Sequence, residues 1–196
     1  DSKALPKVEK NIGKPLSPYA ITKYVNELYA DIYSSAYGLE TIGLRYFNVF
    51  GRRQDPHGAY AAANPKCAGQ FLKGESPHIN GEGSFSRDFT YIDNVIQMNH
   101  LAITTKNSRA INQIYNTAVG DRVTILEMTK LIREGLSQFD SSIRKIEIKF
   151  GPDRNGDIPH SQASIKKAQN LLNYNPTHTF EKGLKESLTW YHKNLK

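Results

Sequence analysis

One helix that leads directly into an apolar strand constrains the fold of this chain more than any other feature. Ser17 and Pro18 predict a helix start, with serine as the N-cap and proline at the first helical position. Gly38 predicts the stop, because glycine is the usual residue just past a helix end. Thr41–Phe47 follows as a predicted buried strand. A helix, a short turn and an apolar strand together indicate an α/β fold of the parallel-sheet kind.

The rest of the chain continues this mixed pattern. Further helices are expected over residues 61–73, 93–104, 124–138, 164–172 and 179–194, and strands or extended segments over 77–80, 87–91, 113–118 and 146–150. Asp93 is the expected N-cap of one helix, and Ser164 that of another. Thr124 and Glu127 form a capping box that opens a third.

Composition excludes several classes of protein. An apolar content of 38% and a charged content of 23% describe an ordinary globular chain, and no apolar run approaches the roughly 18 residues of a membrane span. Cys67 is the only cysteine, which excludes an internal disulfide and a Cys-based metal cage and favours the cytoplasm. The six histidines lack metal-ligand spacing, so no metal is expected. The net charge of +7 is scattered over helix faces, and no nucleic-acid partner is expected.

The first helix also carries a candidate catalytic pair. Tyr19 and Lys23 are four residues apart and share one helical face. An ammonium beside a phenol favours the phenolate, which lets tyrosine transfer protons near neutral pH. Taken alone, the spacing is a weak signal, because most such pairs on helices are surface pairs. Three later blocks give it a context: Ile79–Gly83, Arg87–Asp93 and the segment from Arg154 to Ser161.

With these blocks in this order, the chain resembles the extended short-chain dehydrogenase/reductase superfamily. Within that superfamily it is most similar to the UDP-hexose 4-epimerases, especially the UDP-N-acetylglucosamine branch of bacterial polysaccharide synthesis. The branch-like segments are Gly13–Tyr19, Arg45–Pro56 and Gly58–Ala62. The resemblance implies the second part of a doubly wound NAD-binding domain in residues 1–51. It implies a smaller UDP-sugar-binding domain in residues 52–196, with the strand near 113–118 returning to the first sheet.

The resemblance also implies a chemistry. Tyr19 would be the acid/base for the sugar 4-hydroxyl, and Lys23 would assist it and bind the nicotinamide ribose. Hydride would pass from C4 of the sugar to NAD+ and return to the opposite face of a 4-keto intermediate. Tyr46 would lie near the nicotinamide, although a buried strand tyrosine would leave the same trace in the sequence. A homodimer is expected.

Substrate contacts follow from the same resemblance. Three residues align with groups that bind the UDP pyrophosphate, for which guanidinium is well shaped: Asn48, Arg87 and Arg154. Asp157 would accept from a uridine ribose hydroxyl, and His78, Ile79 and Asn80 would border the uracil. Ser161 would line the space for the sugar 2-substituent, where a small side chain admits an N-acetyl group. Ser161 would serve equally well as a cap for the following helix.

The sequence departs from the family pattern in one large respect. It contains no Gly-x-x-Gly-x-x-Gly turn and no preceding Ser/Thr for the 4-hydroxyl. We expect that half of the doubly wound domain, about 140 residues by analogy, to precede Asp1. The isolated chain is then expected to be inactive and to fold well only beside that half. Smaller departures are Asn64 and Cys67, where isoleucine and tryptophan are usual, and Ser164, where aspartate is usual.

Three alternatives remain open beside an epimerase of UDP-GlcNAc and UDP-GalNAc or of the uronic-acid forms. A nucleotide-sugar 4,6-dehydratase or decarboxylase of the same superfamily would share most of these blocks. A non-catalytic nucleotide-sugar-binding module would fit the missing cofactor half, although the Tyr19/Lys23 pair argues against it. A basic nucleic-acid binder has least support, because no such motif is present.

Overall fold

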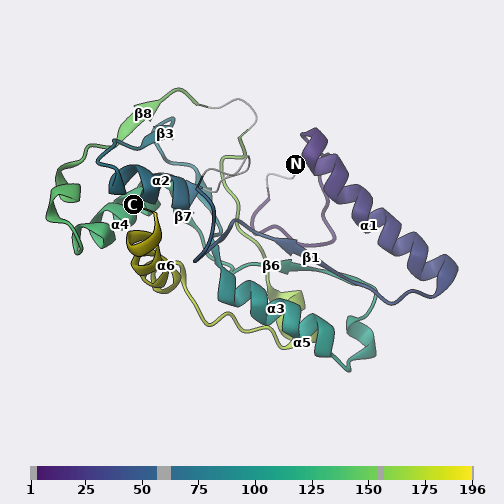
Figure 1. The fold of residues 1–196 in the computed structure, drawn as a ribbon. Helices are drawn as coiled ribbons and strands as arrows, with labels where there is room; N and C mark the ends of the chain where they lie inside the picture. The colour runs from purple at the N-terminus through teal and green to yellow at the C-terminus, as the bar shows by residue number, and fades with distance from the viewer. Residues whose placement is uncertain (1–3, 57–62, 154–156, 196) are drawn as a thin grey trace.

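The computed structural model describes residues 4–56, 63–153 and 157–195, and it has the mixed α/β class predicted from the sequence (Figure 1). The helices are α1 (Pro18–Tyr37), α2 (Ala63–Leu72), α3 (Ile92–Thr104), α4 (Ile125–Ser137), α5 (Lys166–Leu172) and α6 (Phe180–Asn194). The strands are β1 (Ile42–Tyr46), β2 (Val49–Phe50), β3 (His78–Asn80), β4 (Ser86–Arg87), β5 (Thr90–Tyr91), β6 (Gln113–Thr117), β7 (Val123–Thr124) and β8 (Lys149–Gly151). Short 3₁₀ turns cover Ser108–Ala110 and Ser141–Lys145.

Helix α1 has the ends that its sequence predicts. The Ser17 hydroxyl accepts a hydrogen bond from the Ala20 amide, Pro18 is the first helical residue, and Gly38 ends the helix in the left-handed conformation. No residue of α1 is buried, and its apolar side chains remain accessible. In Figure 1 the helix lies beside the β1–β6 pair and apart from the other helices. The position of α1 therefore depends on polar contacts more than on a core.

Strands β1 and β6 pair in parallel and form the central ladder of the chain. Ile42 lies opposite Gln113, and Tyr46 lies opposite Thr117. Helices α3 and α5 pack against this pair on the side away from α1 (Figure 1). A small core fills the space between them, built around Met98, Tyr115 and Tyr174. β1 is only partly buried, not fully as its apolar sequence predicts. The division of the chain at residue 51 stays a prediction.

A larger core joins α2, α4 and α6 to strands β2 and β5. Phe50, Phe89 and Phe180 form a cluster of aromatic rings with centroids 5.1–6.4 Å apart. Gly183 of α6 lies against the ring of Tyr91, and a Cβ there would come within 2.5 Å of it. The glycine therefore permits the close approach of α6 to β5. None of the described helices is long and apolar enough to cross a membrane.

Three short strand pairs surround the larger core. β2 pairs in parallel with β5, β3 pairs in parallel with β8, and β4 pairs antiparallel with β7. The predicted strand over residues 146–150 is too long, because β8 begins only at Lys149. Ile146 instead closes the 3₁₀ turn before it, by donating its amide to Ile143. Alternation of apolar residues gave the right strand but not its start.

The caps predicted at Asp93, Ser161 and Ser164 are wrong, whereas Thr124, like Ser17, is confirmed as a cap. α3 begins at Ile92 after Tyr91, so Asp93 lies in the first turn, where its carboxylate pairs with Arg52 at 2.9 Å. α5 begins at Lys166 after Ile165, without a side-chain cap, so neither Ser161 nor Ser164 caps it. The Thr124 hydroxyl does cap α4 by accepting from the Glu127 amide.

Candidate active site

The proposed catalytic residues line a single groove. Tyr19 and Lys23 lie on the first turns of α1, and the Lys23 Nζ is 5.2 Å from the centroid of the Tyr19 ring. Tyr46, at the end of β1, lines the same groove, which has a volume of about 770 Å³. Tyr19 and Tyr46 are each about half exposed, at 56% and 51%. Side chains at the wall of an open groove can contact a bound molecule.

Tyr46 is not a buried strand tyrosine. Its hydroxyl donates to Asn99 Oδ1 at 3.0 Å, and the Asn99 amide donates in turn to the Val95 carbonyl. The ring is thereby held at the end of β1 by α3. Its exposure excludes the alternative that Tyr46 is a buried core residue of the strand.

An ion pair attaches α1 to β1 next to the groove. The Arg45 guanidinium donates two hydrogen bonds to the Glu27 carboxylate, at 2.7 and 2.8 Å. A third bond runs from Arg45 to the Glu9 carbonyl at 3.0 Å. The hydrogen bond to Glu27 raises the pKa of Arg45, against the opposing effect of burial. Glu27 lies one helical turn beyond Lys23, so this pair fixes the helix close to Lys23.

A second group of predicted residues surrounds Arg87. Its guanidinium donates to the carbonyls of Ser86 and Pro159, at 2.9 and 3.3 Å. Burial lowers the pKa of Arg87, and the nearby Asp157 carboxylate opposes that shift. The Ser161 amide donates to the Ser86 carbonyl, which brings Ser161 to the same segment. Ile158, between Asp157 and Ser161, lines the groove of Tyr19. The two groups are therefore neighbours.

The remaining predicted substrate residues lie on strand ends. Asn48 is exposed, with φ of 31°, a left-handed conformation that asparagine tolerates better than most residues. Its carbonyl accepts from the Thr90 amide. In β3, His78 and Asn80 are exposed, whereas Ile79 is buried. Arg154 lies outside the described residues.

Asp88 is not among the predicted site residues. Its side chain is fully buried, and its oxygens accept from the amides of Val119, Gly120 and Ala163 at 3.0, 3.0 and 3.1 Å. Burial raises the pKa of Asp88 to about 6, although the three amides act to lower it. Position in the Arg87–Asp93 block could have drawn attention to this aspartate. Its partners are 31 to 75 residues away, which spacing does not reveal.

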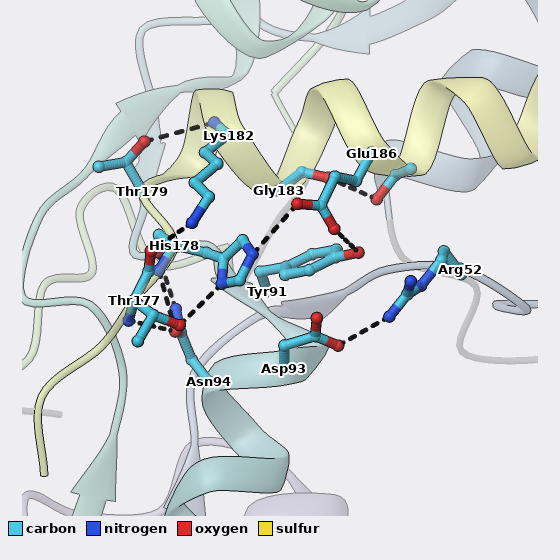
Figure 2. A network of polar contacts seen from close by, with 11 residues as sticks. Arg52, Tyr91, Asp93, Asn94, Thr177, His178, Thr179, Lys182, Gly183 and Glu186 are labelled. Carbon is cyan, nitrogen blue, oxygen red and sulfur yellow. Dashed lines mark hydrogen bonds and ion pairs between the residues drawn. The ribbon is translucent and has the colours of Figure 1, made fainter.

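A second polar network connects β5 and α3 to α6 (Figure 2). His178 Nε2 lies 3.2 Å from a Glu186 oxygen, and the Tyr91 hydroxyl donates to the other at 3.0 Å. Asp93, His178 and Glu186 form a cluster of potential metal ligands that sequence spacing missed. The cluster is already engaged in hydrogen bonds, and the Arg52 guanidinium on Asp93 opposes a cation. We therefore interpret it as a structural network of polar contacts and not as a metal site.

Comparison with known proteins gives consistent matches along the chain. Residues 2–118 match the model of the NAD-dependent epimerase/dehydratase family. UDP-glucuronate 4-epimerase 4 of Arabidopsis thaliana is 32% identical over 91% of this chain and 42% of its own length. The chain spans about half the length of the curated relatives it matches, from 42% to 58% of their own length.

Solved structures agree with the fold. A UDP-glucose 4-epimerase of Thermotoga maritima, with UDP-glucose, matches with a TM-score of 0.89 at 34% identity, over 100% of this chain and 60% of that one. A UDP-N-acetylglucosamine 4-epimerase of Methanobrevibacter ruminantium, in complex with UDP-N-acetylmuramic acid, gives 0.85 at 36%, over 97% and 58%. A UDP-glucuronic acid 4-epimerase of Bacillus cereus, with UDP-glucuronic acid and NAD, gives 0.85 at 28%, over 98% and 58%. These matches confirm the Rossmann-type α/β class and the expected resemblance, and the chain belongs to the NAD-dependent epimerase/dehydratase family.

Proposed function

We propose that the whole protein epimerises C4 of a UDP-sugar with NAD as its cofactor. The observation that carries this proposal is the groove shared by Tyr19, Lys23, Tyr46 and Ile158. It combines an acid/base pair with the edge of the segment that holds Asp157 and Ser161. The relatives named above act on or bind UDP-sugars, and the Bacillus cereus enzyme was solved with NAD.

The residues present fit the nicotinamide end of such a cofactor. Lys23 offers an ammonium donor to a ribose hydroxyl, and Tyr46 offers an aromatic wall to a ring. The glycine-rich turn that would hold the pyrophosphate of NAD is not in this sequence. When bound, NAD would supply a reversible hydride acceptor.

This chain's own residues would handle the proton and the substrate. The Tyr19 hydroxyl would take the proton of the sugar 4-hydroxyl, and Lys23, close to the ring, would stabilise the phenolate electrostatically. Arg87 would bind the pyrophosphate with Asn48 and Arg154, and Asp157 would accept from a uridine ribose hydroxyl. His78, Ile79 and Asn80 would border the uracil. Each of these assignments rests on the family resemblance, and Tyr19 and Lys23 also line the groove.

For the sugar, we favour N-acetylated hexoses or the uronic-acid forms. Ser161 is small and follows the groove residue Ile158 by three residues, and by the family resemblance a small side chain there would admit a bulky 2-substituent. A role in surface polysaccharide synthesis, a cytoplasmic site and a homodimer complete the proposal. Nucleic acid and membrane are not among the proposed partners.

The test is turnover by the whole protein, with any chain that precedes Asp1. Incubated with UDP-GlcNAc or UDP-glucuronate, it should give the C4 epimer with no net consumption of NAD, as followed by anion-exchange chromatography. Tyr19→Phe should abolish turnover and leave UDP-sugar binding intact. A 4-keto-6-deoxy product would instead indicate a dehydratase. Binding without any turnover would indicate a non-catalytic module, and either result would refute the epimerase.

A further inference from the structure

We propose that Asp88 is a positioning residue that holds together the three backbone segments forming the UDP-sugar side of the site. The inference rests on the proposed function and adds a residue to which that function assigns no role. Asp88 directly follows Arg87, and it binds the chain after β6 and the chain two residues beyond Ser161. A single side chain thus links the segment of the proposed pyrophosphate ligand to that of the proposed specificity residue.

The backbone around Arg87 makes this link matter. The Ser86 amide donates to the Pro159 carbonyl at 2.9 Å, and the Ser161 amide donates to the Ser86 carbonyl at 3.0 Å. These bonds fix residues 159–161 on one side of Arg87. The bond from the Ala163 amide to Asp88 fixes the same segment on the other side. Ser86 and Asp88 together therefore fix the segment that carries Asp157 and Ser161 relative to Arg87.

The arrangement needs a carboxylate. Two oxygens accept three amide hydrogens, and each oxygen has at least one donor. An asparagine has one acceptor oxygen, and its NH₂ group would face an amide donor. Asp88→Asn must therefore lose at least one bond while keeping the shape of the side chain. Among the described residues, Asp88 has no ion-pair partner, so its charge is stabilised by backbone dipoles alone.

Other bonds would preserve the fold when Asp88 is changed. The Gln162 side chain donates to the Gly120 carbonyl at 2.8 Å, which joins two of the same segments independently. The Lys7 amide also donates to the Gln162 carbonyl at 2.7 Å. An Asp88→Asn protein should fold with a loosened wall near Ser161. A residue that served the core alone would give only a loss of stability.

Asn94 offers a matched control. It is also fully buried, and its side chain also makes three hydrogen bonds to a distant backbone segment: it donates to the His178 carbonyl and accepts from the Thr177 and His178 amides (Figure 2). None of these residues lines the groove of Tyr19. Asn94→Asp therefore disrupts an equivalent set of buried hydrogen bonds away from the site.

The experiment compares both variants in the whole protein. With the UDP-sugar that the wild type converts, Asp88→Asn should raise KM about tenfold, which is about 1.4 kcal/mol of binding, while kcat falls less than threefold. Asn94→Asp should leave KM within twofold at a comparable loss of thermal stability. Hydrogen exchange should accelerate at one or more of the Val119, Gly120 and Ala163 amides in Asp88→Asn, and at none of them in Asn94→Asp.

The outcomes separate the two proposals. An unchanged KM in Asp88→Asn, with an active wild type, overturns the inference alone. An equal rise of KM in both variants overturns it as well, because it reduces the effect to stability. A wild-type protein that neither binds nor converts UDP-GlcNAc or UDP-glucuronate overturns the proposed function, and the inference with it.

Discussion

The bond between Arg45 and Glu27 provides the sharpest test of how α1 is held. No residue of α1 is buried, so the helix lacks the packing that normally fixes an amphipathic helix to a domain. We expect that replacing Glu27 or Arg45 by alanine will weaken the docking of α1 on β1. The proposed catalytic Tyr19 and Lys23 lie on the same helix, so turnover should fall together with stability.

The magnitude follows from the exposure and geometry of the pair. The Arg45 and Glu27 side chains are 25% and 19% exposed, and two charge-assisted bonds join them. Exposed pairs contribute about 0.2–1 kcal/mol, whereas breaking a buried pair costs about 3–5 kcal/mol. For a pair about one-fifth exposed, we expect a coupling energy of about 2 kcal/mol. Replacing Arg45 also removes its bond to the Glu9 carbonyl, which replacing Glu27 does not. The effect of the Arg45 variant alone would therefore overstate the energy of the ion pair.

A double-mutant cycle isolates the coupling. Urea denaturation of the wild type, Glu27→Ala, Arg45→Ala and the double variant gives four free energies of unfolding, whose non-additivity is the pair term. Because the pair is mostly buried, 1 M salt should remove less than about half of it. A coupling below about 0.5 kcal/mol would place the pair among ordinary surface ion pairs. The argument that it positions α1 would then be refuted.

Three other predictions address separate features. Gly183→Ala should destabilise the protein by about 2 kcal/mol, because its Cβ would collide with the buried ring of Tyr91, and an unchanged urea midpoint would contradict this. Thr124→Ala should cost about 1 kcal/mol in the same assay, since it removes the cap on the Glu127 amide. Burial raises the pKa of Asp88 to about 6 from 3.8, so the folded protein binds that proton more tightly. Protonated Asp88 therefore contributes to the free energy of unfolding in full below about pH 4. This contribution, about 3 kcal/mol at most, is lost as the pH rises through 6. Unfolding measured from pH 4 to 8 should show this trend in the wild type and not in Asp88→Asn, and parallel curves would exclude it.

Local chemistry made the helix ends of this fold predictable where a cap lies within three residues of its partner. Ser17 and Thr124 each accept from an amide three residues later, and both are in the sequence as recognisable caps. Asp93 is also of a residue type that commonly caps helices, and it has a similar setting. Its carboxylate is instead paired with Arg52, which lies 41 residues earlier. A competing non-local charge is invisible to a pattern that spans one helical turn.

The site divides in the same way. Tyr19 and Lys23 could be found from their spacing only together with the later blocks, and Tyr46 only from the family resemblance. The three residues line one groove. Asp88, Asn99 and Glu27 act through residues that are between 18 and 75 positions away. Their contacts arise only when the chain brings distant segments together. The local sequence does not distinguish Asn99 and Glu27 from solvent-exposed polar residues, and the block that contains Asp88 does not reveal the partners of its side chain.

The two sides of the site also share a third segment near the start of the chain. Glu9 accepts from Arg45 through its carbonyl and from the Asn116 amide through its carboxylate. The Asn116 side chain donates to the carbonyls of Lys7 and Ser164, at 3.0 and 3.1 Å. Residues 7–9 therefore contact the ion pair that holds α1 and, through Asn116, the segment just beyond Ser161. Because α1 has no buried residue, the placement of Tyr19 relative to Ser161 depends on these polar bonds and less on a hydrophobic core.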